Sequence, residues 1–242
     1  MKEKSLLRSS SVRSALLALD RVLRADVKAA PPSIRRVSMV VAVCGVIYGV
    51  AMGSYAMFSG HRSFVQQLPQ MIYSATKVPI LLGVTVAVAL PSFFVLNSLL
   101  GLRDDFRQSV RGVIAAQAGM TIVLLSLAPL TLFVYSFLEP GRKNYQLAVM
   151  FNACAFGISS IAAQLLLHRY YAPLVARNPR HRKMMTIWIV TYAFVGIQCA
   201  YILRPFIGDP NQKPSWLRAE SFQNAYVKIF HMAVDIFQIG TG

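Results

Sequence analysis

Charged residues are absent from five long stretches of this 242-residue chain. These stretches contain no Asp, Glu, Lys, Arg or His, and they cover residues 37–60, 78–102, 112–138, 144–167 and 184–203. A bilayer core of about 30 Å takes roughly 20 helical residues to cross, so each stretch is long enough to span it. The sequence therefore predicts an all-α fold, an integral membrane five-helix bundle. We expect its spans at 38–58, 78–99, 113–137, 147–167 and 185–203.

Ionisable groups are missing from the interior of the predicted spans, and so are the common catalytic motifs. An ion-coupled pump usually carries such a group inside the membrane, so this class of protein is disfavoured. The chain has no His-Glu-x-x-His, no Gly-x-Ser-x-Gly and no glycine-rich phosphate loop. We therefore expect no catalytic residue and no cofactor. The uncharged polar residues inside the spans are expected to link helices by hydrogen bonds, and they are Asn97, Gln117, Asn152, Gln164 and Gln198.

Metal-binding patterns are also missing. The three cysteines, Cys44, Cys154 and Cys199, all fall inside predicted spans without a Cys-x-x-Cys pair, which favours a packing role. Asp104 and Asp105 are adjacent and could bind a cation. Flanking arginines make salt-bridged surface groups the simpler interpretation, so no metal site is expected.

Positive charge is distributed unevenly between the two sides of the predicted bundle. The chain has 25 Lys and Arg against 9 Asp and Glu, and 17 of the 25 lie in residues 1–36, 103–111 and 169–183. By the positive-inside rule, the N-terminus is cytoplasmic and the C-terminus extracytoplasmic, and we expect the bacterial cytoplasmic (inner) membrane. Such cations contact anionic lipid on the cytoplasmic face. Nucleic acid is not an expected partner, because no basic face or recognised module is present.

Two terminal segments flank the predicted bundle. Residues 1–36 form a basic cytoplasmic segment in which 11–28 repeat apolar residues at steps of three and four, as an amphipathic helix on the membrane surface does. Residues 205–242 form an extracytoplasmic tail, with a second amphipathic helix expected after Ser221. The bundle itself is assigned to residues 37–204.

Small residues predict where the spans pack. Gly45, Gly49 and Gly53 repeat every four residues and line one helical face, which lets another backbone approach closely. Residues 147–167 are also rich in small side chains, including Ala153 and Gly157, so we expect this span to pack against the glycine face. Arg204 and Trp216 are predicted interface anchors. His181, within a basic loop, is expected to be exposed.

Two features resemble known membrane proteins. The five-span layout with a cytoplasmic N-terminus and a short hairpin at 101–112, which includes Phe106, Arg107 and Gln108, resembles the Yip1-like group. The chain lacks the Asp-Leu-Tyr-Gly-Pro motif of the eukaryotic members. Residues 203–210, followed by Phe222 and the amphipathic tail, are similar to uncharacterised bacterial inner-membrane proteins. The resemblance implies a multi-pass fold and a membrane location, and it transfers no active site.

Three functions remain open from the sequence. The first is a non-enzymatic accessory or scaffold subunit of a larger membrane complex, with other membrane protein subunits as partners. The second is a passive channel or small-solute carrier, suggested by Pro91, Pro129 and the polar residues inside the spans. The third is a lipid-acting membrane enzyme that uses Asp209, His231 or Asp235.

Overall fold

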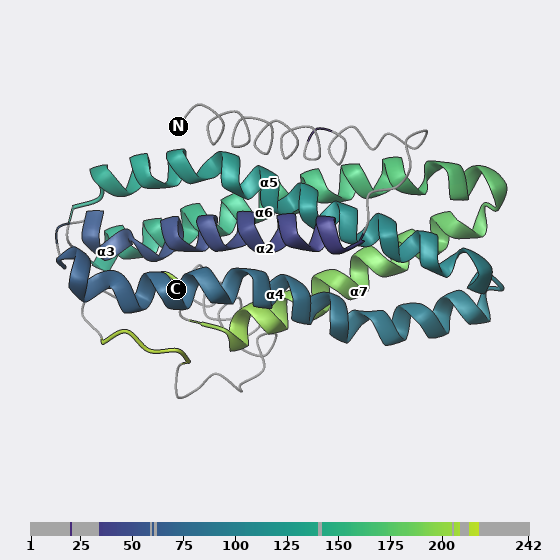
Figure 1. The fold of residues 1–242 in the computed structure, drawn as a ribbon, viewed down its shortest axis with the longest axis horizontal. Coiled ribbons are helices and arrows are strands. Elements are labelled where there is room, and N and C mark those ends of the chain that lie inside the picture. Colours follow the sequence, from purple (N-terminus) through teal and green to yellow (C-terminus); the bar gives the residue numbers. More distant parts are fainter. Residues whose placement is uncertain are drawn as a thin grey trace, which may run out of the picture.

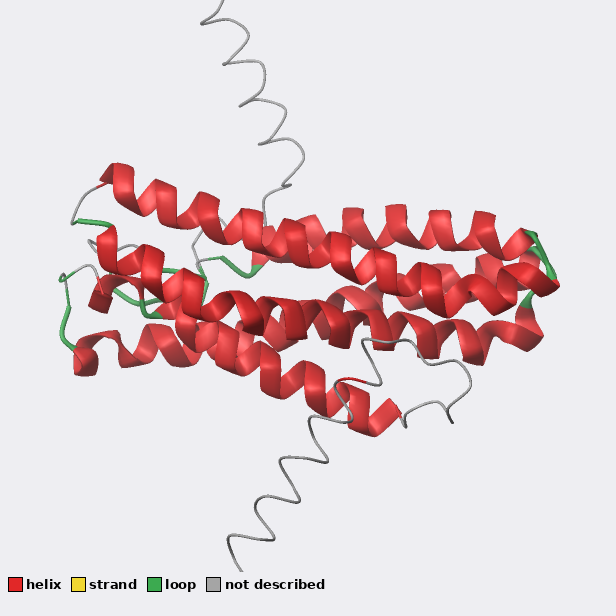
Figure 2. Cartoon of the chain, turned by 90° about the horizontal axis from the view of Figure 1, so that it is seen from above, coloured by secondary structure: helices red, strands yellow, loops and turns green. Residues whose placement is uncertain are grey.

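The structure is a computed structural model that describes residues 20, 34–58, 60, 62–139, 142–204, 206–208 and 213–217. Within these residues every regular element is helical (Figure 2). The elements are α2 (Ile34–Gly53), α3 (Tyr55–Phe58), α4 (Phe64–Leu99), the short 3₁₀ helix η1 (Arg103–Asp105), α5 (Phe106–Phe137), α6 (Arg142–Arg177) and α7 (Arg180–Ile202). The prediction of an all-α bundle is confirmed. Apart from Asp20, both expected terminal amphipathic helices lie outside the described residues.

Five helical segments of the described chain are long and apolar enough to cross a membrane. They run over Ile34–Phe58, Phe64–Leu99, Arg103–Phe137, Lys143–Arg177 and Arg180–Ile202. All five predicted spans are therefore present, and the helices extend past the predicted bounds at most of their ends. The helix of the second span begins well before residue 78, because residues 64–77 are the first turns of α4.

Helix α4 is much longer than its predicted span. Its 36 residues give a length of about 54 Å at 1.5 Å per residue, against a bilayer core of about 30 Å. Pro69, Pro79 and Pro91 all lie inside it, and the helix continues through each of them. A proline removes one backbone donor but does not by itself end a helix whose sides are packed against other helices.

The two ends of the bundle are built differently. The hairpin end is defined here by residues 99–106 and 177–180, which connect α4 to α5 and α6 to α7. The opposite end, called the far end, is defined by residues 53–64 and by 203–208, where α2 and α7 finish. Gly101 turns the chain at the hairpin end with a φ of 71°, a conformation that favours glycine.

Helix α2 occupies the centre of the bundle, between α4 and α5 (Figure 1). Its most extensive contacts are with these two helices, whereas α4 and α5 touch each other only sparsely. The short hairpin makes α4 and α5 antiparallel, as a dozen-residue connection requires. They are not packed together along their length, because α2 separates them.

The glycine face of α2 packs on α4. A Cβ added to Gly49 would lie 2.4 Å from the carbonyl oxygen of Ser74, and one added to Gly53 would lie 2.9 Å from the Cα of Met71. Gly45 is less crowded, with its nearest neighbour at 3.5 Å in Pro79. The prediction that the 147–167 span covers this face is wrong. Ser74 and Ala75 have small side chains, so the backbone of α4 can approach Gly49 closely.

A buried polar network joins α2, α5 and α6. The hydroxyl of Tyr48 donates to Oδ1 of Asn152 at 3.0 Å, and Nδ2 of Asn152 donates to the hydroxyl of Tyr135 at 2.6 Å. Tyr135 donates in turn to the carbonyl of Met52 at 3.3 Å. Tyr48, Tyr135 and Asn152 are almost fully buried, so each polar group is satisfied inside the protein as a lipid environment requires. Asn152 thus links helices as expected.

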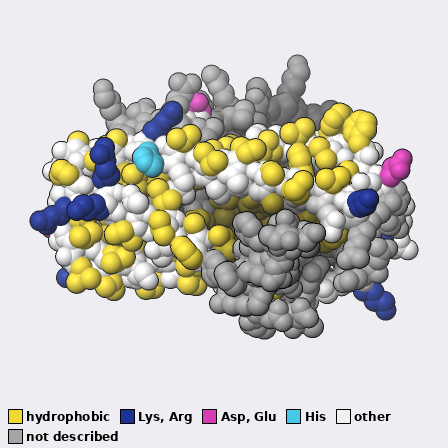
Figure 3. All heavy atoms as spheres, turned by 180° about the vertical axis from the view of Figure 1, so that it is seen from behind, with side chains coloured by type: hydrophobic (Ala, Val, Ile, Leu, Met, Phe, Trp, Pro, Cys, Tyr) yellow, Lys and Arg dark blue, Asp and Glu magenta, His cyan; other side chains and the backbone are white. Residues whose placement is uncertain are grey.

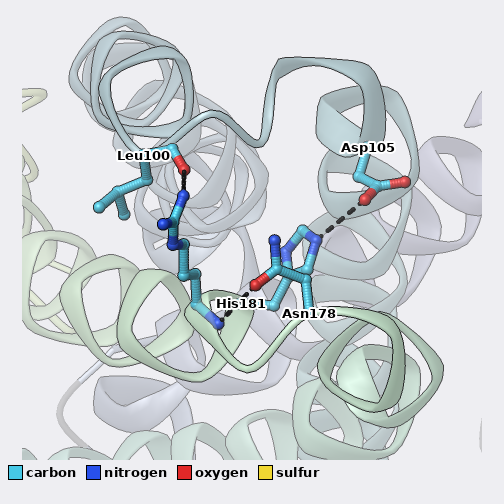
Figure 4. A network of polar contacts seen from close by, with 5 residues as sticks. Leu100, Asp105, Asn178 and His181 are labelled. Carbon is cyan, nitrogen blue, oxygen red and sulfur yellow. Dashed lines mark hydrogen bonds and ion pairs between the residues drawn. The ribbon is translucent and has the colours of Figure 1, made fainter.

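Polar contacts also hold the two connections of the hairpin end together (Figure 4). His181 at the start of α7 lies 3.0 Å from Oδ2 of Asp105, and the Arg180 guanidinium donates to the carbonyl of Leu100 at 3.3 Å. The expectation that His181 is exposed is wrong, since its side chain is fully buried. Its basic neighbours Arg182 and Lys183 face outward, and the helical period turns His181 inward.

The outer surface carries a hydrophobic belt. Figure 3 shows hydrophobic side chains over most of the length of one face, with Lys and Arg concentrated toward its ends. Large exposed apolar residues occur on every long helix, for example Val43, Val88, Phe133, Leu165 and Phe194. Exposed apolar area on this scale is unfavourable in water and matches the hydrocarbon core of a bilayer.

Candidate functional site

A large cavity lies between α4, α5, α6 and α7. Its volume is about 1010 Å³, which is at the upper end of the roughly 300–1,000 Å³ range of small-molecule sites. Helices α6 and α7 supply most of its lining. The face of the molecule that these two helices occupy is hollowed near its middle in the view from behind (Figure 3).

Helix α7 supplies one wall because only its start is deeply buried. Its buried residues are His181, Met184, Met185 and Trp188, all in its first nine residues. Beyond them it runs obliquely to the other long helices (Figure 1). Its lining residues recur at steps of three and four from Ile189 to Arg204, so a single helical face borders the cavity.

Helix α6 supplies the opposite wall and contributes small side chains. Ala153 and Gly157 both line the cavity and are exposed, and no atom lies within 4 Å of a Cβ added to Gly157. On α7, Gly196 lines the cavity and would place a Cβ only against Thr85 of α4, at 3.5 Å. Small residues on both walls widen the space between the two helices.

The cavity is closed toward the hairpin end. Gln117 of α5 is 6% exposed, and its Oε1 accepts a hydrogen bond from the hydroxyl of Tyr192 at 2.9 Å. One turn before Tyr192, the ring of Trp188 packs on Phe93 with centroids 4.6 Å apart. On α7 the lining begins at Ile189, directly after Trp188, and includes no residue nearer the hairpin end. The described structure therefore has a cavity closed at one end and not a pore through the bundle.

A charged side chain, that of Arg204, lies at the mouth of the cavity at the far end of the bundle. Arg204 is the only charged residue in the lining that the structure describes. Its guanidinium lies over the Tyr201 ring, 4.9 Å from the centroid. Phe206 and Ile207 complete the rim, and the carbonyl of Phe206 accepts hydrogen bonds from Gln70 and Ser74 on α4. These bonds tie the segment that follows α7 to the bundle.

A second polar group lies on α4, outside the cavity. Gln67, Gln70, Ser74 and Lys77 are all fully or almost fully buried and share one face of the helix. Lys77 places its Nζ 5.2 Å from the centre of the Trp216 ring, a cation–π arrangement. The sequence interpretation placed Lys77 outside the second span. In the structure it is a buried side chain of the continuous helix α4, one residue before the charge-free stretch that begins at Val78.

The predicted packing and anchor residues fall in different places. Gly49 and Gly53 form the close contact of α2 with α4, whereas Ala153 and Gly157 line the cavity, and a Cβ added to Gly157 meets no atom within 4 Å. Arg204 lies at the same cavity. Trp216 lies apart from it, against Lys77 and Tyr73 on α4. Asp209, His231 and Asp235, the residues of the enzymatic alternative, are outside the described residues.

Sequence reasoning missed Tyr192 as a site residue. Gln117 was identified as a helix-linking group, and it does link α5 to α7. Tyr192 sits in a run of apolar and aromatic residues that is typical of any span, so nothing marked it. The step of four between Trp188 and Tyr192 was the available signal, because it puts two aromatic rings on one helical face.

Metal ligands do not gather in the described part of the chain. Asp105 and His181 are two potential ligands 3.0 Å apart, and no group of three or more His, Cys, Asp or Glu occurs among the described residues. Comparison with protein-family models, with curated proteins and with solved structures gives no match. The Yip1-like resemblance stays a prediction.

Proposed function

We propose that this chain is a non-enzymatic membrane protein that holds an apolar or amphiphilic small molecule between α6 and α7 and acts as a binding protein or carrier. The observation that carries the proposal is the cavity of about 1010 Å³ inside the bundle. Small-molecule sites are concave, mainly apolar and provided with a few polar groups. This cavity has such polar groups in Gln117, Tyr192 and Arg204.

The blind end favours a carrier or binding protein over a passive channel. Water and solutes would have to pass the Gln117–Tyr192 hydrogen bond and the packed rings of Trp188 and Phe93 to reach the hairpin end. We therefore expect liposomes that contain the protein to show no more flux of small hydrophilic solutes than empty liposomes. Sustained solute flux would favour the channel.

A filled cavity is the direct test of the proposal. Gly157→Phe places a ring in the cavity, where the wild-type glycine has no neighbour within 4 Å. Gly83→Phe is the matched control, because Gly83 also has no neighbour within 4 Å but does not line the cavity. Native mass spectrometry of the gently purified protein should detect retained lipid-sized adducts on the wild type and on Gly83→Phe. Gly157→Phe should lose them, and equal adducts on all three proteins would contradict the proposal.

The accessory-subunit role is a second candidate with its own observation. Ala153 and Gly157 form an exposed small-residue surface on α6, against which a helix of another membrane subunit can pack. Under this alternative, stoichiometric proteins co-purify with the wild type, and Gly157→Phe reduces the size of the native complex. A particle that contains this chain alone would remove the alternative.

The orientation completes the proposal. The hairpin end and the first turns of α5 and α7 beside it carry Arg103, Arg107, Arg177 and Arg182, and we propose that this end faces the cytoplasm of a bacterial cell at the inner membrane. The mouth of the cavity then faces the extracytoplasmic leaflet. In a variant whose three native cysteines are replaced by alanine, a cysteine introduced at residue 182 should react with a membrane-impermeant thiol reagent only after cells are opened, and labelling in intact cells would reverse the orientation.

A further inference from the structure

The charge at the cavity mouth points to the chemical class of the ligand. Arg204 is exposed and lines the mouth, and the described residues place no carboxylate within ion-pair distance of it. Its guanidinium carbon lies over the Tyr201 ring, 4.9 Å from the centroid. Stacking on an aromatic ring orients the planar guanidinium while its N–H groups stay available, and a guanidinium binds phosphate through two parallel hydrogen bonds.

The dimensions of the cavity match a lipid of one leaflet. Along α7 the lining runs from Ile189 to Arg204, a rise of about 22 Å at 1.5 Å per residue. Half of a bilayer core is about 15 Å, and the headgroup region of one leaflet adds roughly 6 Å. With a phosphate at Arg204, an acyl chain therefore ends near the hydrogen-bonded pair Gln117 and Tyr192.

The cavity is reached from the side of the bundle. Helix α7 is buried only up to Trp188, and the α6 residues that face it across the cavity, such as Ala153 and Gly157, are exposed. The flanking surfaces are apolar and belong to the belt that faces hydrocarbon. A molecule already dissolved in the bilayer reaches this space without crossing water.

We propose that the cavity between α6 and α7 binds an anionic phospholipid of the surrounding bilayer, with its phosphate at Arg204 and an acyl chain extending to Gln117 and Tyr192. This inference rests on the proposed function and adds the ligand class. A neutral apolar molecule would fill the same volume but would gain no electrostatic binding energy from Arg204. Because the single charge in the described lining is positive, it favours an anionic lipid.

The headgroup is tested by lipid competition. Delipidated protein is titrated with phosphatidylglycerol or with phosphatidylcholine of identical acyl chains, and bound lipid is counted by native mass spectrometry. The wild type should prefer phosphatidylglycerol by about fivefold, the ratio that corresponds to ~1 kcal/mol for one cation near a headgroup. Arg204→Gln should lose this preference and Arg204→Lys should keep most of it. Arg182→Gln, at an exposed arginine of the hairpin end, is the matched control.

The position of the acyl chain is tested by crosslinking. A phosphatidylglycerol with a diazirine at the end of one acyl chain should label the blind end of the cavity, at Gln117, Met120, Ile189 or Tyr192. Labels spread evenly over the hydrophobic belt would overturn the proposed pose. A benzoylphenylalanine at Ile197, which lines the cavity and is exposed, reports any other occupant. A crosslink from this position to residues 218–242 would replace the lipid with the chain's own tail.

The outcomes separate the inference from the proposed function. If both lipids bind equally and Gly157→Phe abolishes both, the cavity holds lipid but the role of Arg204 is wrong. If no bound lipid responds to Gly157→Phe, the inference and the proposed function fail together. Reactivity of Cys44, which is buried in α2, checks that each variant is folded.

Discussion

The contact between α2 and α4 predicts a large difference between two glycine-to-alanine substitutions. In Gly49→Ala the new Cβ would lie 2.4 Å from the Ser74 carbonyl oxygen and 2.7 Å from the Cα of Ala75. Both are backbone atoms of a packed helix, so the clash is not relieved by a rotamer change. One helix must move by about 1 Å to restore ordinary contact, and overpacking of this kind typically costs about 1–3 kcal/mol.

A matched control isolates the clash from the intrinsic effect of the substitution. Replacing a helical glycine with alanine stabilises a helix by about 0.5–1 kcal/mol. Gly83→Ala on α4 has this benefit without a clash, because no atom lies within 4 Å of its added Cβ. The free energies of unfolding of the two variants should therefore differ by about 1–3 kcal/mol, with Gly49→Ala the less stable.

The buried thiol of Cys44 offers the assay. With Cys154 and Cys199 replaced by alanine, Cys44 is the only thiol left in the chain, and it lies on α2 one to two turns from Gly49. Its modification by a thiol reagent across a denaturant series in mixed micelles follows the unfolding of this region. Equal stability of Gly49→Ala and Gly83→Ala would refute the close approach of α2 to α4.

Two further predictions concern the ends of the bundle. In a double-mutant cycle with Asp105→Asn and His181→Phe, we expect a coupling energy of about 1 kcal/mol in unfolding experiments, and additive effects would show that the 3.0 Å contact contributes nothing to the fold. At the far end, Trp216→Ala uncovers the fully buried Lys77, so amine acylation of Lys77 measured by mass spectrometry should rise several-fold relative to exposed Lys213 in the same sample. Unchanged labelling of Lys77 would mean that other groups cover it.

The spans could be predicted from the sequence because the bilayer imposes one simple condition on each of them. A helix inside hydrocarbon must be apolar over about 20 residues, and all five charge-free stretches meet this condition. The helix ends were less predictable. Residues 64–77 contain Gln67, Gln70 and Lys77 and fall outside the predicted span, yet polar residues are tolerated in a helix where protein covers them, as it covers these three.

The pairing of the helices was harder to predict than the helices themselves. Gly49 indicated a close approach, and the structure contains one, but the same pattern does not say which helix approaches. Ala153 and Gly157 looked equally suitable on composition. The difference is that Ser74 and Ala75 on α4 present small side chains opposite Gly49, and this complementarity depends on a register that a single sequence does not define.

The cavity itself follows from the physics of packing in lipid. In water, an apolar space of about 1010 Å³ between two helices would collapse under the hydrophobic effect. Hydrocarbon chains are as apolar as leucine, so nothing comparable drives α7 onto α6 in a bilayer, and packing or hydrogen bonds must do so. The fully buried contacts of α7 lie at its start, in His181 and Trp188, and beyond Tyr192 the helix is only partly buried, with Val195 against the core. Small residues such as Gly157 and Gly196 would allow α7 to approach α6 more closely, but they supply no contact that stabilises this approach. The second half of α7 therefore stays separated from α6, and molecules of the bilayer can enter the space between the two helices.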